Sequence, residues 1–210
     1  KHMPAASDDA PRDAPHVSLL DVSHNHCTSG SKTGVALAKY VRAQSTLHGL
    51  HLEANRVAHA QLADAIGAHI HECRLTELNV RHCKFGKKET LAITAALSKN
   101  AVDSTDLAAL ASGATRRTAQ QAPVRSSFRL PGGGWAMLPP VTVLLLGHNT
   151  FGADAVRKLA FFVENSATLR QLSLARVKTP SRRDLKHLLY ACGRSRSLDE
   201  LELTGCECND

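Results

Sequence analysis

Histidine and cysteine are the residue types in this chain that could do chemistry, because both are common ligands of transition metals. The 210 residues include 12 His and 6 Cys. Three short segments hold the closest groups: His24, His26 and Cys27; His69, His71 and Cys73; Cys206 and Cys208. Structural zinc sites space their paired Cys or His ligands differently, and side chains two residues apart on a helix point away from each other. We therefore expect no metal and no other cofactor.

The sequence also lacks the short motifs of catalytic sites. It contains no Gly-x-Ser-x-Gly nucleophile elbow, no Walker phosphate loop and no His-Glu-x-x-His zinc motif. The three consecutive glycines at 132–134 lie in a proline-rich segment rather than directly before a helix, where a phosphate loop would lie. We therefore predict that the chain is not an enzyme.

The composition is that of a globular protein with a positive charge. Hydrophobic residues make up 43% and charged residues 21%, and the formal net charge is +7. No apolar run approaches the roughly 20 residues of a membrane-spanning helix, and the N-terminus has no apolar signal-peptide core. Six Cys are too few for a disulfide scaffold, which favours a reducing compartment. We expect a cytoplasmic protein without a membrane span that can meet acidic partners.

An internal repeat predicts the elements that position these residues. A pattern of apolar-x-apolar-x-x-Asn or Cys begins at Leu20, Leu50, Leu78, Leu144, Leu172 and Leu201. It ends at Asn25, Asn55, Cys83, Asn149, Val177 and Cys206, with Val177 as the one departure, at intervals of 30, 28, 66, 28 and 29 residues. Alternating apolar residues predict a short strand with one buried face, and the Asn or Cys can bond to the backbone where the chain leaves the strand.

Each strand is followed by the pattern of an amphipathic helix. The apolar positions are Leu62, Ile66 and Ile70; Leu91, Ala95 and Leu97; Val156, Leu159, Ala160 and Val163; Leu185, Leu188, Leu189 and Cys192. One strand and one helix cannot bury both of their apolar faces alone, so neighbouring units must stack. Stacking predicts a parallel concave sheet with helices on its convex side.

This pattern resembles the leucine-rich repeat family, in the ribonuclease-inhibitor-like subtype with repeats of about 28–29 residues. The resemblance covers residues 17–210 and implies an α/β solenoid, or horseshoe, of about six repeats with one long insertion. It also implies protein–protein binding inside the cell, in a cytoskeletal, centrosomal or flagellar scaffold. The alternative is a regulator of a small GTPase, because one member of the family is a GTPase-activating protein.

The two ends of the chain carry separate expectations. Lys1-His2-Met3 resembles an expression scar, and the rest of residues 1–16 lacks periodicity, so we expect a flexible leader there. The domain at 17–210 stops just after a strand-like segment, which suggests a fragment of a longer protein. A last strand without its helix would expose an edge through which the protein could self-associate.

The interval of 66 residues predicts an insertion at about 101–140. Residues 112–140 are rich in Pro and Gly and are predicted to be a loop, with four Arg, no acidic residue and the chain's single Trp. Either this segment packs over neighbouring apolar surface, or it binds a partner through Trp135, Arg129 and Phe128, since interface hot spots favour Trp and Arg. A degenerate extra repeat is a further alternative.

Because side chains alternate between the two faces of a strand, the sequence predicts which side chains lie on the concave sheet face, three from each repeat. They are Leu19, Asp21 and Ser23; Gly49, His51 and Glu53; Glu77, Asn79 and Arg81; Val143, Leu145 and Gly147; Gln171, Ser173 and Ala175; Glu200, Glu202 and Thr204. The candidate partner-binding residues on this face are Glu53, Arg81, Val143, Leu145, Glu200 and Glu202. The two apolar candidates either form an interface or are covered by another part of the protein.

Basic residues recur at similar offsets on the predicted helices. They are Lys87, Lys88, Arg157, Lys158, Arg182, Arg183 and Lys186. They form either a solvated helix face or a basic convex stripe that contacts an acidic partner. Nucleic acid is a less favoured partner, because aromatic residues are not interleaved with these cations.

Overall fold

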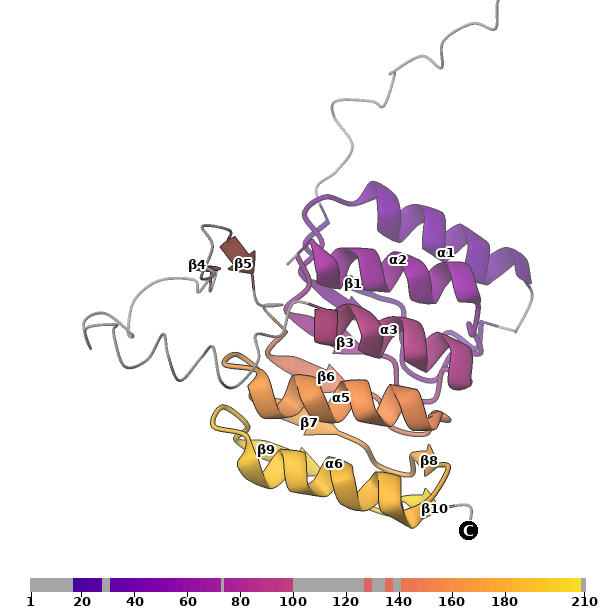
Figure 1. Ribbon diagram of the computed structural model, residues 1–210. Coiled ribbons are helices and arrows are strands. Elements are labelled where there is room, and N and C mark those ends of the chain that lie inside the picture. The colour runs from indigo at the N-terminus through magenta and orange to yellow at the C-terminus, as the bar shows by residue number, and fades with distance from the viewer. Residues whose placement is uncertain are drawn as a thin grey trace, which may run out of the picture.

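The protein is an α/β structure built on a parallel sheet of six short strands (Figure 1). The structure is a computed structural model, and it describes residues 17–27, 31–72, 74–99, 127–129, 135–137 and 141–208. The strands lie side by side in chain order. They are β1 (Leu19–Asp21), β2 (Gly49–His51), β3 (Glu77–Asn79), β6 (Val143–Leu145), β7 (Gln171–Ser173) and β9 (Glu200–Glu202).

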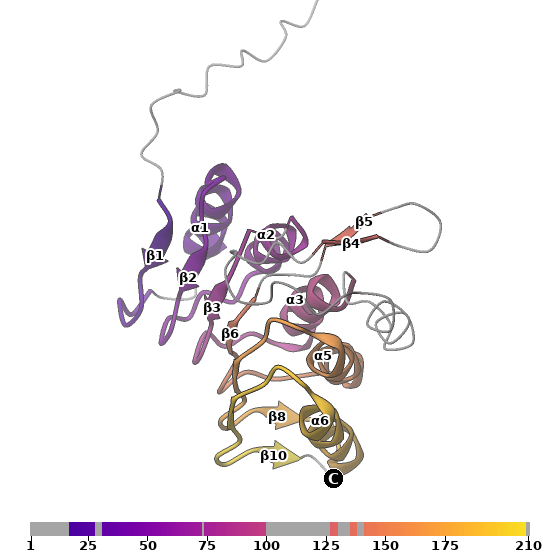
Figure 2. The ribbon, with the colours of Figure 1, turned by 90° about the vertical axis from the view of Figure 1, so that its left-hand side faces the viewer.

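Five described helices form a second layer against this sheet. They are α1 (Ser31–Ala43), α2 (Ala60–His71), α3 (Lys87–Lys99), α5 (Ala153–Asn165) and α6 (Arg182–Arg194). Successive helices pack against each other in the same order as the strands. Figure 2 shows the sheet on the inner side of a curve and the helices on its outer side, so one sheet face carries no helix. None of the described helices combines the length and the apolar character that crossing a membrane requires.

The strand register is the one that the leucine spacing predicts. Backbone pairing places Leu20, Leu50, Leu78, Leu144, Leu172 and Leu201 in one row across the sheet. The four inner leucines of this row are fully buried between sheet and helices. The interval of 66 residues therefore leaves the ladder unbroken, and β3 pairs directly with β6.

Asparagine side chains join successive layers where the chain leaves the strands. The Asn149 amide donates to the carbonyls of Leu146 in its own layer, at 3.0 Å, and of Val80 in the preceding layer, at 2.8 Å. Its oxygen accepts from the Phe85 backbone N–H at 2.9 Å. The buried Asn55 repeats this arrangement between the layers of β2 and β1.

The cysteines at the same position keep part of this arrangement. The Cys83 thiol donates to the Leu52 carbonyl at 3.1 Å, and the Cys206 thiol donates to the Leu174 carbonyl at 3.2 Å. Each bond again reaches the preceding layer. The predicted backbone-bonding role of this position is therefore confirmed. Val177, which occupies the same position in the fifth layer, has no side-chain donor.

The helix cores follow the predicted stripes fully in α2 and α5 and in part in α3 and α6, where Leu185 is half-buried. All the apolar positions predicted for α2 and α5 are buried. In α3 the buried residues include Ile93 and Leu97, whereas Leu91 and Ala95 are half-buried. Leu189 was predicted to be buried but is 40% exposed. That prediction is wrong because, among the described helices, α6 packs against α5 alone.

The predicted loop at 112–140 contains two strands, which corrects the loop prediction. Strand β4 (Ser127–Arg129) pairs antiparallel with β5 (Trp135–Met137). The other residues of the 101–140 insertion, and residues 1–16, lie outside the described part of the chain. A second small sheet, also not predicted, pairs β8 (Lys178–Thr179) in parallel with β10 (Glu207–Cys208).

Candidate interaction surface

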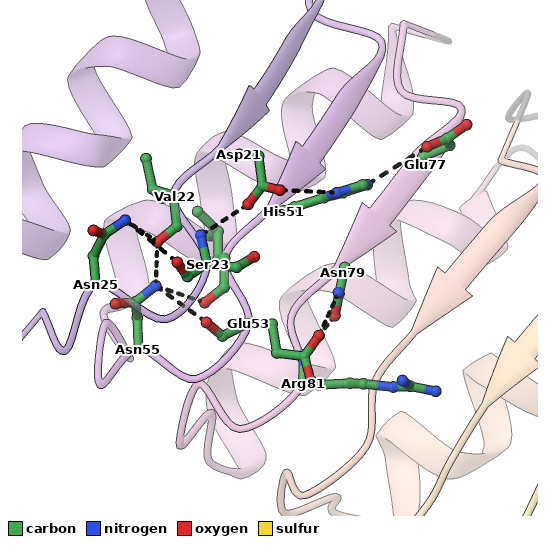
Figure 3. A network of polar contacts seen from close by, with 11 residues as sticks. Asp21, Val22, Ser23, Asn25, His51, Glu53, Asn55, Glu77, Asn79 and Arg81 are labelled. Atoms are coloured by element: carbon green, nitrogen blue, oxygen red, sulfur yellow. Dashed lines mark hydrogen bonds and ion pairs between the residues drawn. The ribbon is translucent and has the colours of Figure 1, made fainter.

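The concave sheet face carries polar side chains at the positions that alternate with the buried leucines. In the first three layers these side chains make a row across the strands (Figure 3). His51 Nδ1 lies 3.9 Å from Asp21 Oδ2, and His51 Nε2 lies 3.5 Å from Glu77 Oε2. The Ser23 backbone N–H donates to the Asp21 carboxylate at 2.9 Å, and this bond lowers the pKa of Asp21 below its ordinary value.

Two of the predicted partner-binding carboxylates are held by neighbours on this face. Glu53 accepts a hydrogen bond from the Asn79 amide at 2.9 Å. Glu202 forms an ion pair with Arg81 and accepts a hydrogen bond from the Ser173 hydroxyl at 2.7 Å. Asn79 and Ser173 are buried as a result, although both belong to the sheet face without helices. Sequence reasoning named Glu53, Arg81 and Glu202 one by one and missed that each is paired.

The centre of the face is apolar, and one end of it carries an uncommitted carboxylate. Val143 and Leu145 of β6 are half-buried, which makes them neither an exposed patch nor part of the core. Glu200 is exposed, and within the described part of the chain no group bonds to its carboxylate. The candidates of β6 and β9 therefore differ: two supply apolar surface and Glu200 supplies a free charge.

The three candidates in the insertion lie on the β4–β5 pair. Arg129 and Trp135 are direct backbone partners across the two strands, and Phe128 pairs with Ala136. Since their backbones are adjacent, Arg129 and Trp135 belong to one local element. In Figure 2 this pair lies away from the strands of the main sheet. The structure thus does not bring the insertion candidates together with those of the concave sheet face.

The turns after the strands hold a histidine pair that sequence reasoning missed. The His82 and His148 rings are stacked with their centroids 3.3 Å apart. Burial lowers the pKa of both imidazoles, and the neighbouring Arg176 and Lys84 act in the same direction. Because β3 pairs with β6, the equal offset of the two histidines from the repeat pattern was the available signal.

Every one of these turns also places a residue in the left-handed region. The residue directly before the Asn or Cys position has a positive φ, from 52° to 67°, in all six layers. These residues are His24, Ala54, His82, His148, Arg176 and Gly205. Glycine is the residue that this backbone region favours, so Gly205 was the one hint of this geometry in the sequence.

The basic residues of the convex stripe lie where the sequence placed them. Lys87 and Lys88 begin α3, Arg182 and Arg183 begin α6, and Arg157 and Lys158 lie in the second turn of α5; all are exposed. Arg157 and Lys186 of the stripe have partners on their own helices. Arg157 pairs with Asp154, and the Lys186 ammonium lies 5.7 Å from the centre of the Tyr190 ring. The charge of Arg157 is therefore offset within α5, whereas the ring of Tyr190 leaves the charge of Lys186 in place.

The metal-ligating residue types are dispersed in the described parts of the chain, where no three His, Cys, Asp or Glu side chains are grouped to hold an ion. His69 is buried, and its Nε2 bonds to the Val41 carbonyl at 2.6 Å, whereas His71 is exposed. Cys27, Cys83, Cys192, Cys206 and Cys208 are free thiols. The structure thus explains His69 and Cys83 as parts of the packing.

The chain matches no protein-family model, and a comparison with curated proteins finds no significant relative.

Proposed function

We propose that this chain is a leucine-rich-repeat solenoid and that its function is to bind another protein on its concave sheet face. The observation that supports this proposal is a sheet with one face sealed by helices and the other lined by charged side chains. A sheet face without helices usually needs only solvated polar residues. Here Val143 and Leu145 also place half-buried apolar surface between the polar side chains of β3 and β7, an arrangement found at protein interaction sites.

We propose an intracellular location and a scaffolding role, in a cytoskeletal, centrosomal or flagellar assembly. The five described free cysteines fit a reducing compartment, because an oxidising one would favour disulfides. The alternative function is the regulation of a small GTPase, which no observation of the structure favours.

The test compares affinity purification of three forms of the protein from cell extract. The first form is unchanged, the second carries Glu200→Arg on the concave sheet face, and the third carries Asp64→Arg on the exposed side of α2. Both substitutions reverse an exposed carboxylate, so they change the net charge equally. We expect the same partners with the unchanged and Asp64→Arg forms and their loss with Glu200→Arg.

Equal recovery of partners by all three forms would show that binding does not use the concave sheet face. Recovery of tubulin or basal-body proteins supports the scaffold. Recovery of a nucleotide-loaded small GTPase, whose hydrolysis rate the protein then raises, would replace the scaffold with the regulator.

A further inference from the structure

The concave sheet face is acidic although the protein as a whole is basic. Its carboxylates are Asp21, Glu53, Glu77, Glu200 and Glu202, and Arg81 is its one permanent cation. Five carboxylates and one guanidinium give a formal charge of −4 with His51 neutral, in a chain whose formal net charge is +7. Such an asymmetry attracts cationic groups to this face and repels them from the rest of the surface.

One row of side chains across four strands of this face has a carboxylate at each end. The strand register aligns Glu77, Val143, Gln171 and Glu200 on four neighbouring strands. Because neighbouring strands are about 4.8 Å apart, Glu77 and Glu200 are separated by about 14 Å, with Val143 and Gln171 between them. The row therefore presents a carboxylate, an apolar side chain, an uncharged amide and a second carboxylate, in that order across the strands.

Within the described residues, neither carboxylate at the ends of this row pairs with a lysine or an arginine. Glu200 has no bonding partner within the described residues, and the only described partner of Glu77 is the His51 imidazole, 3.5 Å away. An imidazole opposes that charge only when it is protonated. Glu53 and Glu202, by contrast, are held by Asn79 and by Arg81.

The protein already shows how this face holds a guanidinium. Arg81 extends from the end of β3 past the layers of β6 and β7 to pair with Glu202 of β9. The equivalent positions of the two layers that it passes are occupied by the small residues Gly147 and Ala175. A cationic side chain can thus extend past the layers of β6 and β7 and end on a carboxylate of the last strand.

We propose that the concave sheet face binds a basic segment of a protein partner in extended conformation, with cations at positions i and i+4 and an apolar residue at i+2. In an extended chain, residues i and i+4 lie about 13 Å apart and point to the same side as residue i+2. That spacing matches the separation of Glu77 from Glu200. This inference rests on the proposed function, because it names the partner chemistry for the same surface.

The test uses labelled nine-residue peptides and the full-length protein, with binding measured by fluorescence anisotropy. The first peptide has a central Lys-Ser-Leu-Ser-Lys, the second has the same composition with both lysines adjacent at one end, and the third replaces lysine with glutamate. We expect the first peptide to bind at least fivefold more tightly than the second. Raising the salt from 50 to 300 mM should weaken binding several-fold, since these charges are exposed.

The double variant Glu77→Gln, Glu200→Gln should weaken binding of the first peptide about fivefold to tenfold, because two exposed ion pairs are lost. The matched control Asp64→Asn on α2 should bind it unchanged. Equal binding of the first two peptides, or an equal affinity of the double variant and the control, would overturn the proposal. So would a preference for the glutamate peptide that the double variant alters.

This design separates failure of the inference from failure of the proposed function. If Glu200→Arg abolishes partner recovery while no basic peptide binds, the face is an interface but its partner chemistry is not basic. If basic peptides bind and natural partners are recovered equally by all forms, the protein-binding function lies on another surface.

Discussion

Replacing Asn149 by alanine should strongly destabilise the protein. The Asn149 side chain is 2% exposed and satisfies the carbonyls of Val80 and Leu146 and the Phe85 backbone N–H. Alanine removes these three bonds and a longer one to the Gly147 carbonyl at 3.2 Å, and it leaves the first three backbone groups unpaired in the interior. Each unsatisfied buried group costs about 1–3 kcal/mol, so we expect a total loss of about 4 kcal/mol.

The same position supplies two graded controls. Asn149→Cys should cost about half as much, because a thiol at this position, as at Cys83, still donates to the preceding layer. Asn25→Ala removes the same side chain from an exposed layer, where the Asn25 amide donates to the Val22 carbonyl at 2.8 Å. Water can replace that bond, so the loss there should stay below about 1 kcal/mol.

Urea denaturation followed by circular dichroism measures the three variants. With a slope of about 2 kcal/mol/M, Asn149→Ala should lower the midpoint by roughly 2 M. Hydrogen exchange adds a local readout, since the Phe85 amide should lose its protection in this variant and keep it in Asn25→Ala. A difference of less than about 0.5 kcal/mol between Asn149→Ala and Asn25→Ala would refute the view that the buried amide joins the layers.

Three further predictions concern protonation, thiol reactivity and close packing. Because the pKa of His148 is lowered in the folded protein, the unfolded chain binds more protons in acid, and stability should fall as the pH drops through the ordinary His value of 6.5. Between pH 7.5 and 5.5, the free energy of unfolding should fall less for His148→Gln than for the unchanged protein, and an equal fall would contradict this prediction. Burial raises the pKa of the Cys83 thiol to about 12, so iodoacetamide at pH 8 should modify half-buried Cys208 long before Cys83, as peptide mass spectrometry can show. Gly147→Ala should cost about 1–3 kcal/mol, because the new Cβ would lie 2.8 Å from the Ala175 carbonyl oxygen in the next layer. Gly193→Ala in α6 has nothing within 4 Å of the new Cβ and should stabilise the protein by about 0.5–1 kcal/mol. Thermal unfolding in which Gly147→Ala is the more stable variant would contradict the packing argument.

The strand register could be predicted because one physical requirement fixes it. A strand with a buried face must place its leucine toward the helices, and a shift by one residue would turn that face outward. The six leucines starting at Leu20 therefore aligned in the structure as they do in the sequence. The Asn or Cys position was predictable for a similar reason, since a buried carbonyl needs a donor, and in five of the six layers this side chain supplies one.

Features that depend on a particular neighbour could not be predicted in this way. Arg81 and Glu202 are 121 residues apart, and their pairing depends on the small residues in the two layers between them. Leu189 repeats the helical spacing of buried residues but lies in a helix with one described neighbour. The strands of the β4–β5 pair are only three residues long, too short for alternation to distinguish them from a loop.

The positions that the fold fixes are therefore distinct from the positions that can carry function. Leucine in the strand and Asn or Cys at the turn recur because each layer must bury the first and bond the second. The first strand position faces away from the helices and varies between layers, from Gly49 to Glu77 to Val143. Some polar side chains on this face serve the sheet itself, since Ser173 is buried under the carboxylate that it bonds. Glu200 makes no such bond within the described residues. Its charge therefore does not stabilise the sheet and is available to a partner.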